Sequence, residues 1–561
     1  MANLTKSKTL FGITSPRTLE KIIPEIKLLL QLFEGKSWTG NQELQSHFFE
    51  SLFKTDFYEG KSYPSDPALA ARDRITRAPK ALGFIDLKPK IELTKSGKAL
   101  IEGKRINEIF TRQLLKFQLP SPYHTQSIKI EFNVKPYLEL LRLINDLESL
   151  SKTEIALFFL QLTNLDKYEL ILNKIKRFRN QSKHFKGTRK TYVHQCFKSE
   201  VIQIFKEDIH KKNFKTRETD DATLKKFIAT KRRNMKDYAD AFSRYIRATG
   251  LVTIQKKTFR LIISSQKKEE VSFLLKKTKR NPIQFKDLKE FKKYLFIHDN
   301  INLFSDNKRR LTSKLRRLGY KIEGKRITLE KLKDMLENAE RKLKRNNIKE
   351  ERKVLKTYKR FPQILHVFKQ IEAKEIPDPS LFLEWNVWRA FEMLNYAKKI
   401  NGNFSIDLEG MPLHYAPGGF ADIEAEYDDF NLIIEVTMST GHTQYKMENE
   451  SVPRHFGKLK SRKKDCDMYC IFIAPKISEG TLAHYFNLNR METKLYGGKT
   501  KIIPLSIELF VQFIEIGVKD KFNNPKKLQS WLENIWEFNQ SCNDETLWYD
   551  QIGQNIKNWV V

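Results

Sequence analysis

Two acidic residues, Asp422 and Glu435, are spaced so that they could hold a metal ion together. Residues 421–427 and 430–438 are each typical of a β-strand, and Asp428-Asp429 between them is typical of a turn. The midpoint of positions 422 and 435 is the centre of that turn. In an antiparallel hairpin these residues would therefore face each other, with Cβ atoms about 4.5–5.5 Å apart. The spacing predicts an opposed pair of carboxylates.

Such a pair has few stable arrangements. Two like charges at this distance raise each other's pKa unless a cation lies between them. Glu435 also interrupts an apolar run, where an unpaired carboxylate would cost several kcal/mol. Oxygen ligands without a Cys or His cluster suit Mg²⁺. The alternative is a solvated Asp422 with a salt bridge between Glu435 and Lys446.

The flanking segments supply further candidates. Glu384 lies on an aromatic-rich amphipathic helix, FLEWNVWRAF, and Lys446 and Glu448 lie on a helix expected after Gly441. A helix at 454–464 and a buried strand at 468–475 follow. The order helix, hairpin, helix, strand is that of a PD-(D/E)XK nuclease core. His442 and His455 are nearby, but we expect each to be a hydrogen-bonded structural histidine.

The charge of the chain is divided sharply along its length. The net charge is +35 overall, but it is +40 over residues 1–376 and −5 over residues 377–561. A basic body joined to a slightly acidic module is typical of a protein that binds nucleic acid with its first part. The alternative is a merely solvated basic surface. The sequence predicts no membrane span and no secretion signal, and its four cysteines favour a reduced, intracellular location.

The basic part contains two outlines of a helix followed by a hairpin, as in a winged helix. The first is the segment 69–85, followed by a polar turn at 86–90 and the segment 91–101, and the second is the helix 232–245 with the ribbon 249–263. Basic helices of this kind can enter the major groove. The alternative for each residue is an ordinary exposed helix face. The DNA-contact candidates are Arg72, Arg74, Arg77, Arg233, Asn234, Lys236 and Arg244.

The predicted fold is therefore multidomain α+β. Residues 1–135 and 136–300 form two winged-helix-like recognition subdomains, and residues 301–376 form a helical linker with an apolar stripe at Leu332, Met335, Leu336 and Ala339. The segment IPDPS ends the linker, and residues 377–561 form a PD-(D/E)XK α/β nuclease domain.

Nearly the whole chain resembles the AlwI-type restriction endonucleases, a type IIS family that includes site-specific nicking enzymes. The resemblance is densest in GGFADIEAEYDDFNLIIEVTMSTGHTQYKMENESVPRHF (418–456) and in FLEWNVWRAF. Weaker similarities are SPRTLEKIIPEIKLL, ARDRITRAPKALGF, RRNMKDYADAFSRYIRATGL and CIFIAPKI.

The resemblance implies that Glu384, Asp422, Glu435 and Glu448 form the metal site, with the Val436 carbonyl as a further ligand. Thr437 stands where the wider superfamily has a catalytic lysine. Either Glu448 or Lys446 would then take that place. Asp422 and Glu435 would anchor Mg²⁺, Glu448 would orient the water or accept its proton, and Lys446 would offset charge on the phosphate. Gln444 is a candidate for positioning the phosphate.

These expectations describe an endonuclease that binds a short asymmetric sequence in double-stranded DNA and cuts a few base pairs away, leaving 3′-hydroxyl and 5′-phosphate ends. One active site cuts one strand, so the chain would nick, dimerise transiently or use a small catalytic subunit. A cognate DNA methyltransferase and a bacterial cytoplasmic location are implied by the resemblance alone. The alternatives are a DNA-binding regulator whose C-terminal module serves assembly, and a structure-directed nuclease.

Overall fold

The protein forms two compact units, which we call unit 1 and unit 2. Unit 1 comprises residues 1–52 and 64–342, and unit 2 comprises residues 53–63 and 343–561. The computed structural model describes residues 4, 7–55, 57–58, 63–124, 132–216, 218–322, 327–394, 396–463 and 466–560. The structure divides the chain into two units, with a boundary at 342/343. The sequence predicted four segments, the last of which, the nuclease domain, begins at residue 377. The mixture of helices and strands confirms the predicted α+β class.

Unit 1 is mostly helical. Two short antiparallel hairpins accompany the helices, β1 (Ile85–Asp86) with β2 (Glu92–Leu93) and β3 (Val252–Ile254) with β4 (Leu261–Ile263). The helices are α1 (Ile22–Phe33), α2 (Gln42–Phe53), α3 (Pro67–Ile75), α4 (Lys95–Glu102), α5 (Ile106–Lys116), α6 (Pro136–Asp146), α7 (Lys152–Leu157), α8 (Tyr168–His184), α9 (Arg189–Ile204), α10 (Lys206–His210), α11 (Leu224–Ala248), α12 (Lys268–Lys277), α13 (Leu288–Leu295), α14 (Lys308–Arg317) and the first half of α15 (Leu329–Leu355).

The first predicted ribbon is only partly correct. β1 and β2 pair as expected, but the chain then turns into helix α4 instead of continuing as a strand to residue 101. The Thr94 side chain caps this helix by accepting a hydrogen bond from the Gly97 amide at 3.0 Å. The second outline is confirmed, because α11 is followed by the β3–β4 ribbon. The assignment of both outlines as winged helices stays a prediction.

The charged segment after residue 305 is helical, as predicted, and its first two helices form a hairpin. Helices α14 and α15 pack through Leu311, Leu315, Leu332 and Leu336, and Met335 covers this small core. The predicted stripe therefore does face a partner helix. The C-terminal half of α15 belongs to unit 2, so the helix is shared along its length between the two units.

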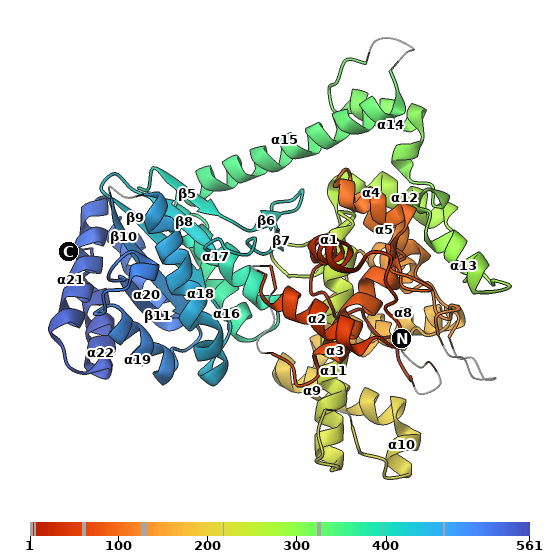
Figure 1. The fold of residues 1–561 in the computed structure, drawn as a ribbon, viewed down its shortest axis with the longest axis horizontal. Coiled ribbons are helices and arrows are strands. Elements are labelled where there is room, and N and C mark those ends of the chain that lie inside the picture. Colours follow the sequence, from red (N-terminus) through yellow and green to blue (C-terminus); the bar gives the residue numbers. More distant parts are fainter. Residues whose placement is uncertain are drawn as a thin grey trace. The chain divides into compact units, whose positions relative to one another are not determined.

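Unit 2 is built on one mixed five-stranded sheet (Figure 1). Its strand order is β11 (Ile502–Ser506), β10 (Asp467–Ala474), β9 (Phe430–Val436), β8 (Ile423–Glu426) and β5 (Lys399–Gly402). The pairs β9–β10 and β10–β11 are parallel, whereas β8–β9 and β5–β8 are antiparallel. A small hairpin, β6 (Ser405–Ile406) with β7 (Pro412–His414), lies between β5 and β8 in the chain. The helices of unit 2 are α16 (Phe361–Glu372), α17 (Pro379–Leu394), α18 (Gly441–Arg462), α19 (Glu479–Leu488), α20 (Ile507–Lys519), α21 (Pro525–Ser541) and α22 (Glu545–Asn555).

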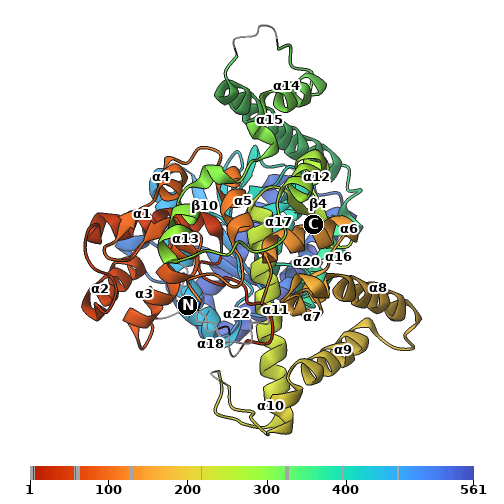
Figure 2. The same ribbon diagram turned by 90° about the vertical axis from the view of Figure 1, so that its right-hand side faces the viewer.

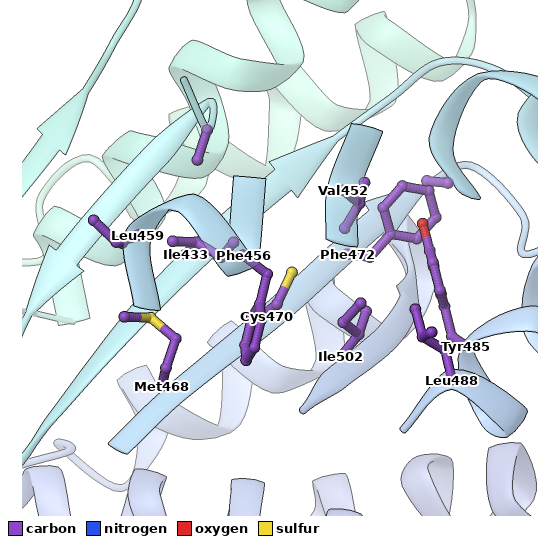
Figure 3. Close-up of a cluster of buried hydrophobic side chains, with 12 residues drawn as sticks. Ile433, Val452, Phe456, Leu459, Met468, Cys470, Phe472, Tyr485, Leu488 and Ile502 are labelled. Carbon is purple, nitrogen blue, oxygen red and sulfur yellow. The ribbon is translucent and has the colours of Figure 1, made fainter. Parts of the chain in front are cut away.

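One face of this sheet is covered by α18 and α19. Ile433 of β9 and Cys470 and Phe472 of β10 pack there against Phe456 of α18 and Tyr485 of α19 (Figure 3). Side chains alternate along a strand, so Glu435, two residues after Ile433, points to this same face. The helix α18 is therefore the element that can bring side chains to Glu435.

Helix α18 is longer than predicted. We expected one helix after Gly441 and a second at 454–464, but α18 runs without a break from Gly441 to Arg462 and contains Pro453. A proline inside a helix costs about 3 kcal/mol. Burial of Val452, Phe456 and Leu459 along one face offsets that cost, because all three belong to the core of unit 2.

Helix α16 was predicted to be part of the linker, but it belongs to unit 2. Ile364, Val367, Phe368 and Ile371 are buried on one of its faces, and the Phe368 ring makes an edge-to-face contact with Phe510 of α20. The helix also packs on α17, whose Asn386 side chain donates a hydrogen bond to the Ile364 carbonyl at 3.0 Å. The predicted linker 301–376 is thus divided between the two units.

Within the described ranges, no helix combines the length and the apolar character needed to cross a membrane.

Candidate active site

The predicted hairpin register is present in unit 2. Ile423 pairs with Ile434 and Glu426 pairs with Asn431, so β8 and β9 are symmetric about the Asp428-Asp429 turn. The turn is closed by a hydrogen bond from the Tyr427 amide to the Phe430 carbonyl at 3.0 Å. Continuing this register by one residue places Asp422 opposite Glu435.

Asp422 is held at the end of the hairpin by the backbone of the opposite strand. Its Oδ2 accepts a hydrogen bond from the Val436 amide at 2.8 Å. Burial and the Glu435 charge nevertheless raise the pKa of Asp422 well above its ordinary value. The carboxylate is therefore oriented by the backbone, but its surroundings do not stabilise its ionised form.

Glu435 is a buried carboxylate in contact with a histidine. Its side chain is almost inaccessible, and its Oε1 lies 2.8 Å from His455 Nδ1. Burial and then the charge of Glu448 raise the pKa of Glu435 well above its ordinary value. The alternative in which Glu435 forms a salt bridge with Lys446 is wrong, because its partner is His455.

His455 is hydrogen-bonded, as predicted, but the sequence did not show that its partner is Glu435. Burial, and then the charge of Arg454, lower the pKa of His455 to about 4, so the ring is neutral at pH 7. Its Nε2 is buried without a hydrogen-bond partner among the described residues. Glu448 and His455 are seven residues apart on α18 and so lie on one face of that helix. That spacing was the available signal.

Glu384 joins the same group from α17. It is buried, and its pKa is raised well above the ordinary value by burial and then by the charges of Asp422 and Asp378. Its Oε2 is inaccessible to solvent and has no hydrogen-bond partner in the described part of the chain. An unpaired carboxylate oxygen in the interior is costly and marks a place where a cation would be stabilised.

Glu448 and Lys446 have different surroundings although only one residue separates them on α18. Glu448 is half-buried, and its charge raises the pKa of both Asp422 and Glu435. Lys446 is exposed. A step of two residues turns a helix by about 200°, so Lys446 faces away from the side that carries Glu448. Of these two residues, Glu448 is therefore the one that lies with the carboxylates.

Gln444 does not suit the predicted role in positioning phosphate. Its side chain is fully buried and has three backbone partners: Nε2 donates to the carbonyls of Ser439 and Lys476, and Oε1 accepts from the Ser478 amide. The distances are 3.0, 2.9 and 2.7 Å. Gln444 instead ties the start of α18 to the loop that precedes α19. It is a structural residue.

The carboxylates fit a divalent cation with oxygen ligands. In the ranges that the structure describes, no group of three His, Cys, Asp or Glu side chains is arranged so that it could hold a metal ion. Magnesium commonly uses one or two protein carboxylates and completes its shell with water and substrate phosphate. The opposed pair Asp422 and Glu435 meets that requirement. The unpaired oxygen belongs to Glu384, whose carboxylate interacts electrostatically with Asp422.

Three of the predicted DNA-contact residues line one pocket of unit 1. Arg77, Asn234 and Arg244 border a pocket of about 630 Å³. The Arg77 side chain donates to Thr14 Oγ1 at 2.9 Å, and Arg244 Nε donates to the Arg17 carbonyl at 2.8 Å. The pocket therefore brings these arginines together with three carboxylates, and Arg77 and Arg244 are ion-paired with Asp73 and Asp240.

The other candidates are not gathered there. Arg74 was predicted to contact DNA, but its guanidinium instead forms an ion pair at 2.6 Å with the fully buried Glu25 inside unit 1. Arg72 lies 3.4 Å from Gln45 Oε1. Arg233 and Lys236 are exposed on α11, and their contacts with DNA stay predictions.

Comparison with known proteins identifies a family that the chain matches. The model of the AlwI restriction endonuclease family matches residues 80–513. No curated protein matches the chain. The small subunit R.BspD6I2 of the heterodimeric restriction endonuclease R.BspD6I is 26% identical over 35% of this chain and 98% of its own, with a TM-score of 0.31. The BpuJ1 endonuclease binding domain, solved with pyrene- and phenanthrene-modified DNA, is 13% identical over 53% of this chain and 98% of its own, with a TM-score of 0.33.

Proposed function

Because the chain belongs to the AlwI restriction endonuclease family, we propose that it is a Mg²⁺-dependent type IIS enzyme. Unit 1, which holds the basic surplus, reads a short asymmetric sequence in double-stranded DNA. Unit 2 hydrolyses a phosphodiester a few base pairs away. The observation that supports this proposal best is the register that opposes Asp422 to Glu435, two carboxyl groups whose ionised forms the protein alone does not stabilise and a bound cation would.

Each acidic residue has a distinct part in the proposed chemistry. Asp422 and Glu435 would hold the ion. Glu384 and the Val436 carbonyl would become further ligands only after a shift in position, because no three such side chains in the described ranges are already arranged around one ion. When bound, Mg²⁺ supplies positive charge to the scissile phosphate and to the attacking water. Glu448 would orient that water or accept its proton. An ionised Glu435 can only accept hydrogen bonds, so His455 Nδ1 would donate to it and keep its carboxylate oriented.

The same architecture leaves the number of cut strands to be set by assembly. One carboxylate cluster acts on one strand. A single chain would therefore nick, and cleavage of both strands would need a second copy or a small catalytic subunit. A DNA methyltransferase that protects the same sequence would complete the system.

Cleavage of plasmid DNA tests the proposal directly. Full-length protein with supercoiled plasmid and Mg²⁺ should give nicked or linear product, and EDTA should prevent it. Sequencing of the ends should show one recurring motif at a constant offset, with 5′-phosphates. The absence of any product at every protein level would favour the DNA-binding regulator. Cuts without a common motif would favour a structure-directed nuclease.

Variants at Lys446 and Glu448 of α18 should show which of these two residues takes the role of the catalytic lysine that Thr437 replaces. We expect Glu448→Gln to slow cleavage by about 100-fold or more, the usual contribution of a general base. We expect Lys446→Gln to slow it by less than about fivefold, because an exposed charge is screened by salt. Single-turnover cleavage rates at saturating enzyme measure both. Equal losses would instead assign Lys446 to the water-activating step.

A further inference from the structure

The hairpin of helices α8 and α9 in unit 1 carries a concentrated positive charge that the proposed recognition of DNA bases does not use. Between Glu169 and Glu200 the chain contains nine Lys and Arg residues and no Asp or Glu. Figure 2 shows α8 and α9 extending from the body of unit 1 to the loop that joins them. The charge therefore lies on a projecting element of unit 1.

The inward face of this hairpin neutralises its own cations. Lys174 pairs with Glu200 at 3.0 Å, and Arg179 pairs with the buried Glu154 at 2.8 Å. Leu172, Ile175 and Phe178 are buried on the same side of α8. These contacts join α8 to α9 and to α7 in the body of unit 1, and they account for two of the nine basic residues.

The outward face is different. Six basic residues near the tip are exposed, and within the described part of the chain none of their side chains has an ion-pair partner. These residues are Lys176, Arg177, Lys183, Lys186, Arg189 and Lys190. Mutual repulsion of six like charges is unfavourable for the free protein. A surface of this kind is stabilised when a polyanion covers it.

The tip is held in shape by aromatic packing. Tyr192 of α9 stacks on Phe178 of α8, with ring centroids 5.3 Å apart, and contacts Phe185 of the joining loop at 5.1 Å. Its hydroxyl donates to the Phe178 carbonyl at 3.3 Å. The cations are therefore presented by a packed element, which reduces the entropy lost on binding.

We propose that this basic tip binds the phosphate backbone of duplex DNA beside the recognition sequence, independently of base identity. Lys176 and Lys183 are two turns apart on α8, about 10 Å along its axis. Duplex DNA presents about six phosphates over that length, one per 1.7 Å. The charge and spacing match a backbone contact, and four of the six exposed cations are lysines, whose compact charge binds phosphate. Asn180 and Gln181 are also exposed on this tip, so comparing cognate with random duplexes is what separates backbone binding from base reading. This inference rests on the proposed function, because it requires DNA as the ligand.

The test is the salt dependence of DNA binding by the full-length protein. The variant K183Q/K186Q/K190Q removes three of the six charges, and K519Q/K521Q/K526Q removes three exposed lysines from unit 2 as the matched control. Each phosphate contact contributes about 0.9 to the slope of log K against log salt concentration. We expect the tip variant to lower that slope by about two to three, for cognate and random duplexes alike, and the control to leave it unchanged.

Three outcomes would overturn the inference. The slope could be unchanged in the tip variant, or it could fall equally in the control, which would make the effect one of net charge. The tip variant could also weaken cognate binding alone, which would assign the tip to base reading. Thermal unfolding of both variants checks that they fold. If the unmodified protein bound no duplex DNA at any salt concentration, the proposed function itself would fail, which distinguishes the two failures.

Discussion

Replacing Glu435 by glutamine is expected to abolish DNA cleavage while DNA binding survives. Glutamine keeps the size of the side chain and removes the charge that, with Asp422, would hold the cation at the scissile phosphate. Loss of one such electrostatic contribution costs on the order of 100- to 1000-fold in rate. The affinity for DNA should hardly change, because the basic surplus lies in residues 1–376. Single-turnover cleavage and equilibrium binding to the same cognate duplex measure the two effects.

Glu426→Gln is the matched control for this variant. Glu426 lies on the same hairpin, is exposed and forms an ion pair with Lys463 at 2.7 Å. Surface ion pairs contribute about 0–1 kcal/mol, so cleavage should persist. Cleavage by E435Q at the unmodified rate would show that the opposed carboxylates do not form the active site.

Replacing Phe368 by alanine is expected to destabilise unit 2 by about 3–5 kcal/mol, the range for deleting a buried phenylalanine. Phe368 is 1% exposed on α16 and packs against Phe510. Six of the seven tryptophans lie in unit 2, so urea unfolding followed by tryptophan fluorescence reports mainly on that unit. The midpoint of this transition should fall markedly.

Lys369→Ala provides the comparison on the same helix. Lys369 is exposed, and alanine is a good helix former, so this change should alter stability by no more than about 0.5 kcal/mol. If F368A left the fluorescence transition unchanged, α16 would be part of a helical linker, as the sequence predicted, and would not be part of the core of unit 2. The result also bears on fragments: a nuclease fragment that starts at residue 377 would lack α16 and expose the surface that it covers.

The features that the sequence predicted correctly are local ones. The register of the β8–β9 hairpin follows from strand periodicity and the Asp428-Asp429 turn, both of which are encoded within sixteen residues. The same holds for α11 with its ribbon and for the stripe on α15. The division of charge at residue 376 is a property of composition and needs no fold to be seen.

The tertiary structure decided the features that depend on contacts between distant segments. Arg74 pairs with the buried Glu25, which lies 49 positions earlier in the chain. Gln444 is hydrogen-bonded to the backbone of Lys476 and Ser478, more than 30 positions later. His455 meets Glu435 because α18 crosses the face of the sheet on which Glu435 points. Periodicity reveals which side of an element is buried, but not which residue of another element will be opposite. That choice is made by packing, and here it determined which candidate side chains remain available for chemistry.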